Sequence, residues 1–117
     1  MKKHFWWMSV ALWLPLQAAA QDGRFHSPVD IPFLMSGSFG EPRPNHFHCG
    51  IDVKTQGVVG KRVLSVYDGY VSRLTVGYDG FGNAVYVTHP NGLVSVYCHL
   101  NEFVPALKEV VRRCQYK

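Results

Sequence analysis

Several features that would place this 117-residue chain in a common class are missing from its sequence. Beyond residue 20 there is no long apolar run, and the run at 5–16 is too short to cross a bilayer as a stable helix. The chain also lacks a large excess of charge of either sign. The formal charge of +4 falls to +2 once Lys2 and Lys3 are set aside, which does not favour nucleic acid as a partner. The three cysteines, an odd number, cannot all pair within one chain.

The first twenty residues have the pattern of an export signal. Lys2 and Lys3 form a basic head, the apolar run follows, and Ala18-Ala19-Ala20 supplies the small side chains that a signal peptidase requires. No cysteine follows the run closely, so a lipoprotein is not indicated. A membrane anchor is the alternative. We expect a signal peptide at 1–20, no membrane anchor after cleavage, and a mature chain exported to the periplasm or cell envelope.

The mature chain divides into an irregular N-terminal segment, 21–38, and one domain, 39–117. Runs rich in β-branched and aromatic residues, several alternating at period two, predict a mainly β, antiparallel domain. Asp68-Gly69 and Asn91-Gly92 are turn signals, and the second pair favours a hairpin because both of its residues tolerate positive φ. The expected strands lie at 33–35, 63–67, 70–76, 83–88 and 93–98.

The C-terminal part changes to helical spacing. Apolar residues from Phe103 to Cys114 recur on one face, and Asn101 is a suitable N-cap, so we expect an amphipathic helix there. The glycine-rich stretch 77–83 is a poor phosphate loop, since it lacks the Lys-Ser/Thr pair and no helix follows it. It better suits a turn at the edge of a groove.

Residues 45–52, Asn-His-Phe-His-Cys-Gly-Ile-Asp, carry the strongest chemical signal. If this segment is extended, His48 and Asp52 share a face and flank Gly50, which has no side chain between them. An imidazole nitrogen and a carboxylate oxygen in this arrangement suit zinc. The alternative is a surface strand with an unremarkable His and Asp. The same parity also permits a three-ligand site in which His46 joins the pair.

Two further histidines follow the expected strands. His99, at a strand end, can project into a groove and orient a zinc-bound water or stabilise an oxyanion. The alternative is a histidine bonded to a nearby carbonyl. His89, before Pro90, belongs to the hairpin corner. Alternation turns Cys49 and Cys98 away from the site, so we interpret both as small packed side chains.

These motifs occur in an order that is more specific than any one of them. The sequence presents HCGID at 48–52, VYDGYV at 66–71, GFGNAV at 80–85, HPNG at 89–92 and YCHL at 97–100. This succession resembles the lysostaphin-type (LytM-like) zinc metallo-endopeptidases of peptidoglycan, over about residues 39–100. The resemblance implies an antiparallel β-sandwich of the duplicated hybrid motif type, here incomplete.

The resemblance also implies roles. His48 and Asp52 are implied zinc ligands, and His99 is an implied catalytic helper. The family's third ligand is the second histidine of a later His-x-His motif, and no histidine follows His99. We therefore expect a domain truncated before that motif, in a chain that is inactive alone.

Three functions follow from these patterns. The first is a zinc endopeptidase that cuts the peptide stems or cross-bridges of peptidoglycan. The second is a non-catalytic module that binds peptidoglycan or activates wall amidases. The third, a lipoyl-like carrier, is disfavoured because neither Asp68-Gly69 nor Asn91-Gly92 offers a lysine at a hairpin tip.

Overall fold

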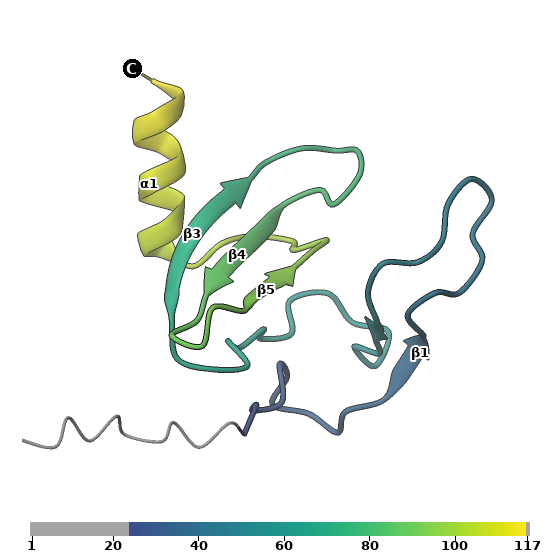
Figure 1. Cartoon of the computed structure of the whole chain (residues 1–117). Coiled ribbons are helices and arrows are strands. Elements are labelled where there is room, and N and C mark those ends of the chain that lie inside the picture. Colours follow the sequence, from purple (N-terminus) through teal and green to yellow (C-terminus); the bar gives the residue numbers. More distant parts are fainter. Residues whose placement is uncertain (1–23, 117) are drawn as a thin grey trace, which may run out of the picture.

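The computed structural model describes residues 24–116, with five strands and one helix in that range (Figure 1). The expected signal peptide and Lys117 lie outside the described residues. Two antiparallel sheets and a C-terminal helix confirm the expected mainly β class. In chain order the elements are β1 (Met35–Gly37), β2 (Asp52–Val53), β3 (Tyr70–Thr75), β4 (Ala84–Thr88), β5 (Val94–Tyr97) and α1 (Pro105–Gln115).

The larger sheet has the strand order β3-β4-β5. All three strands fall within ranges expected from the sequence, where alternating β-branched residues suit a half-buried pleated surface. Because β4 lies between two partners, its side chains are the best covered: Ala84, Val85 and Val87 are buried. Val85 and Val87 form a small core with Phe103.

A tight turn joins β4 to β5. The N–H of Gly92 donates to the carbonyl of His89 at 3.0 Å, and the N–H of His89 donates to the carbonyl of Leu93 at 2.9 Å. Gly92 has a φ of 83°, which glycine adopts without steric cost. In residues 24–116 the non-glycine residues with positive φ are Gln56 and His99. The expectation of positive φ at Asn91 is therefore wrong, and the loop is one residue longer than a two-residue Asn-Gly turn.

The smaller sheet pairs β1 with β2 and places Gly37 opposite Asp52. The strand expected at 33–35 thus lies two residues further along. The strand expected at 63–67 is absent, and only an isolated bridge between Val63 and Val29 forms there. Pro28 explains the interruption: its carbonyl accepts from Leu64, but proline has no N–H with which to continue the ladder.

Helix α1 begins at Pro105 rather than after Asn101. Its N-cap is Val104, which makes no side-chain capping bond. Proline suits the first turn of a helix, whereas a helix starting at 102 would place the ring where an N–H is needed. Leu107 and Val111 pack against the core around Phe103, so α1 stands beside β3 in Figure 1. In the described part of the chain, no helix is long and apolar enough to span a membrane.

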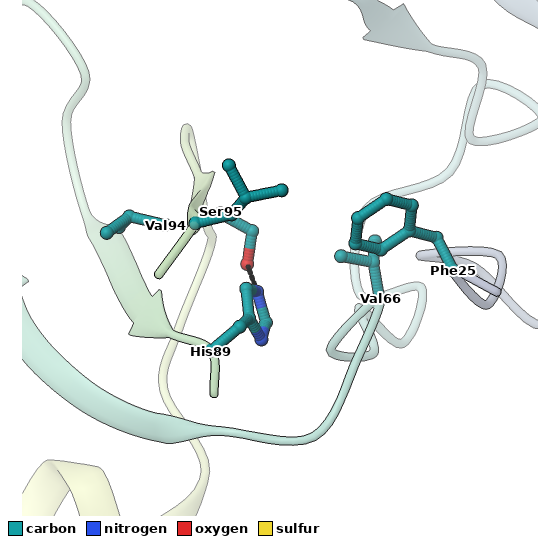
Figure 2. Close-up of a pocket in the computed structure, with 6 residues that line it drawn as sticks. Phe25, Val66, His89, Val94 and Ser95 are labelled. Atoms are coloured by element: carbon teal, nitrogen blue, oxygen red, sulfur yellow. Dashed lines mark hydrogen bonds between the residues drawn. The ribbon is translucent and has the colours of Figure 1, made fainter. Parts of the chain in front are cut away.

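His89 ties the hairpin corner to the preceding chain. Its imidazole is only 3% exposed; Nδ1 lies 2.8 Å from the carbonyl oxygen of Asp68 and Nε2 lies 2.9 Å from Ser95 Oγ. Figure 2 shows His89 and Ser95 on one side of a shallow, mainly apolar pocket, with Val66 and Phe25 on the other side. The structure thus places His89 in the framework of the sheet.

Candidate metal site

A tight loop between β1 and β2 brings His48 into place. The N–H of Gly40 donates to the carbonyl of His48 at 2.7 Å, and the N–H of His48 donates to the carbonyl of Glu41 at 2.8 Å. A bridge between Pro42 and Phe47 closes the same loop. The loop fixes the backbone of His48, and β2 fixes that of Asp52.

The side chains of His48 and Asp52 face each other. His48 Nε2 lies 3.2 Å from Asp52 Oδ1, and the two side chains are 17% and 41% exposed. The continuous strand expected through 48–52 is wrong, since β2 begins only at Asp52. Gly50 also matters less than expected, because a Cβ there would stand 4.0 Å from His48 Nε2, an ordinary contact. The two side chains converge through the loop instead.

The contact made by Nδ1 of His48 indicates that the other ring nitrogen, Nε2, is available to bind a metal. Nδ1 lies 3.0 Å from the carbonyl oxygen of Ser38, which can only accept a hydrogen bond. Arg43 Nη2, which can only donate, lies further from Nδ1, at 3.5 Å, so the shorter contact with Ser38 favours the neutral tautomer that carries its proton on Nδ1 and its lone pair on Nε2. Metal-binding histidines are commonly oriented by a hydrogen bond of this kind.

Arg43 holds the second oxygen of Asp52. Its Nη2 donates to Asp52 Oδ2 at 2.7 Å and to Glu41 Oε2 at 3.1 Å. The bond from Arg43 lowers the pKa of the Asp52 carboxyl below its ordinary 3.8, and charge on His48 and His99 acts in the same direction, against the opposing effect of burial. Arg43 was not among the site residues predicted from the sequence, where its only signal is a cation five residues before His48.

The distance between His48 and Asp52 suits a shared cation. Two ligands at the zinc–nitrogen and zinc–oxygen bond lengths and a tetrahedral angle stand about 3.3 Å apart, close to the 3.2 Å between Nε2 and Oδ1. His46 does not join them; its Nδ1 contacts the Asn45 side chain at 2.7 Å. Within residues 24–116, no three His, Cys, Asp or Glu side chains gather closely enough to hold a metal. The three-ligand hypothesis involving His46 is therefore wrong.

His99 follows β5 with its side chain exposed and a φ of 56°, in the left-handed region. Its N–H donates to the carbonyl of Phe81 at 2.9 Å, and the next N–H, of Leu100, donates to the carbonyl of Asn83 at 3.0 Å. These bonds join His99 to the glycine-rich stretch 77–83. Charge on His99 is the smallest of the causes that lower the pKa of Asp52.

Two cysteines adjoin these histidines in sequence. Cys49 is exposed, so its interpretation as a packed side chain is wrong. Cys98 is partly buried, and burial, with a smaller effect of Cys49, raises the pKa of its thiol. The chain is irregular from 48 to 51, so the alternation of a strand that would have turned Cys49 inward does not hold there.

Comparison with known proteins agrees with this arrangement. Residues 46–116 match the family model of Peptidase family M23, over more than half of the chain. The chain belongs to peptidase family M23. Searches of curated proteins and of solved structures gave no significant match. The match confirms the family resemblance drawn from the ordered motifs, and M23 proteins are generally metal-dependent peptidases.

Proposed function

We propose that this M23 peptidase domain, inactive with the two metal ligands it brings together itself, acts once a third ligand completes its site as a zinc-dependent endopeptidase of the cell envelope, on peptide stems or cross-bridges of peptidoglycan. One observation carries the proposal: in a member of a metallopeptidase family, His48 Nε2 and Asp52 Oδ1 converge at 3.2 Å. The ordered motifs and the signal-like N-terminus support the substrate and the location. A second supporting feature is the absence of a strong charge that would point to nucleic acid.

Each site residue has a role in this proposal. His48 and Asp52 would hold the metal, since Nε2 and Oδ1 are the atoms they turn toward each other. Zinc bound there would polarise the scissile carbonyl and lower the pKa of a bound water. The role proposed for His99, which is exposed beside the glycine-rich stretch, is to hydrogen-bond the attacking water or the developing oxyanion.

The number of ligands limits what the described residues can do alone. A catalytic zinc needs three protein ligands and one open position, whereas residues 24–116 bring two together. We therefore expect weak zinc binding and no hydrolysis from this chain by itself. A third ligand from another segment or chain would complete the site.

The test combines zinc binding with wall binding. The chain without residues 1–20 is titrated with zinc by calorimetry and sedimented with purified peptidoglycan, in parallel with His48→Ala and Asp52→Ala. We expect weak zinc binding that both variants lose, and zinc-dependent sedimentation with the wall. Zinc-dependent release of peptides by this chain would contradict the expected inactivity. Wall binding unaffected by zinc or by either variant would favour the non-catalytic module instead.

A further inference from the structure

A row of three charged side chains, Glu41, Arg43 and Asp52, includes one member of the candidate metal pair. Arg43 Nη2 contacts Glu41 Oε2 at 3.1 Å and Asp52 Oδ2 at 2.7 Å, so one nitrogen bridges two carboxylates. Glu41 and Arg43 come from the loop that also carries His48. Arg43, itself paired with Glu41, thereby holds Asp52, a residue on a different element, β2.

The individual atoms show what this contact does. Arg43 binds Oδ2, whereas the other oxygen, Oδ1, faces His48 Nε2. A carboxylate held at one oxygen cannot rotate freely, so Oδ1 stays directed at the imidazole. Arg43 Nη2 lies 3.5 Å from His48 Nδ1, the nitrogen turned away from Asp52. The guanidinium thus stands behind the pair and leaves the space between Nε2 and Oδ1 open.

Gly37 leaves room for the ends of these three side chains. It lies opposite Asp52 in the β1–β2 pair and is buried. A Cβ built at this position would overlap Asp52 Oδ2 and stand 2.8 Å from Arg43 Nη2 and 3.0 Å from Glu41 Oε2. No positive φ occurs at Gly37, so the effect of a Cβ there would be to displace the ends of these three side chains.

We propose that Arg43 is a positioning residue of the metal site, holding Asp52 so that Oδ1 and His48 Nε2 face one divalent cation, and that Gly37 keeps the space this contact needs. This inference rests on the proposed function, because it assumes that the pair binds a metal. Removing outer partners of metal ligands typically weakens metal binding by about 10–100-fold. We expect a loss of that order for Arg43→Met and for Gly37→Ala, and a smaller loss for Arg43→Lys, which keeps the charge.

The first measurement is zinc affinity by calorimetry for the chain without residues 1–20 and for these three variants. Arg62→Met is the matched control, because Arg62 pairs with Asp30 at 3.6 Å elsewhere on the surface. Gly77→Ala is the control for glycine, since a Cβ at Gly77 meets nothing within 4 Å. Both controls should bind zinc as the wild type does, and thermal unfolding shows that each variant is folded.

The second measurement needs no metal. Crystal structures of zinc-free wild type and Arg43→Met give the distance between His48 Nε2 and Asp52 Oδ1, which we expect to lengthen in the variant. An unchanged distance together with unchanged affinity would overturn the role of Arg43, as would tighter zinc binding, which would make Arg43 a competitor of the metal. A wild type that binds no zinc would refute the proposed function, and the two zinc-free structures would still decide whether Arg43 positions Asp52.

Discussion

Removing the His89 imidazole tests how strongly the hairpin corner supports the three-stranded sheet. The ring is almost fully buried and contacts the Asp68 carbonyl and Ser95 Oγ, whose hydroxyl bonds Tyr97 Oη at 2.8 Å. Tyr97 Oη accepts in turn from the N–H of Val66 at 2.8 Å. His89→Ala would break one end of this chain of hydrogen bonds and leave its partners without a replacement.

The expected cost follows from these contacts. Two hydrogen bonds contribute about 1 kcal/mol each, and the unfilled space adds about 1–2 kcal/mol, which gives roughly 3–4 kcal/mol in the free energy of unfolding. In a domain of this size 1 kcal/mol corresponds to about 4–8 °C, so the melting temperature should fall by roughly 12 °C or more. His89→Gln can keep one hydrogen bond and should lose less.

Urea unfolding followed by far-ultraviolet circular dichroism measures both variants against the wild type. His46→Ala is the matched control, because the His46 side chain is exposed and contacts only its neighbour Asn45 among the described contacts. A surface change of this kind should cost within about 0.5 kcal/mol. If His89→Ala costs no more than His46→Ala, the buried network does not stabilise the fold as argued.

Three further predictions concern single groups. The Asp52 carboxyl has a pKa below 3.8 in the folded protein, so its contribution to the stability of the fold is complete above pH 3.8 and is lost as the pH falls through the lower, folded value. A carbon-13 NMR titration should show that Arg43→Met returns the pKa of Asp52 toward 3.8. After reduction, iodoacetamide should alkylate exposed Cys49 faster than Cys98, whose burial raises its pKa; equal rates by mass spectrometry would contradict this. Gly69→Ala should lower the urea midpoint, because its Cβ would overlap a backbone oxygen of β4, and an unchanged midpoint would show that the turn can yield.

The larger sheet was the part of the fold most open to prediction from the sequence. Strands β3, β4 and β5 are consecutive, and short turns join β4 to β5, so local alternation and turn residues carry most of the information. The failures at 63–67 and Asn101 both involve proline. Pro28, far from 63–67 in the sequence, interrupts its pairing, and Pro105 sets the first turn of α1.

The candidate site was only partly predictable. The spacing of His48 and Asp52 suggested that their side chains meet, and they do, although through a loop rather than a regular strand. Arg43 and Gly37 could not be found in this way. Their importance depends on the pairing of β1 with β2, a contact between segments fifteen residues apart, and no local pattern specifies which glycine will face a carboxylate.

The two backbone bonds that join residues 99 and 100 to the glycine-rich stretch have a mechanical consequence. A polymer strand that settles against residues 77–83 and displaces them must carry the imidazole of His99 with it or break both bonds. Occupancy of the loop and the placement of that imidazole are thus coupled by the main chain itself, without any side chain acting as intermediary.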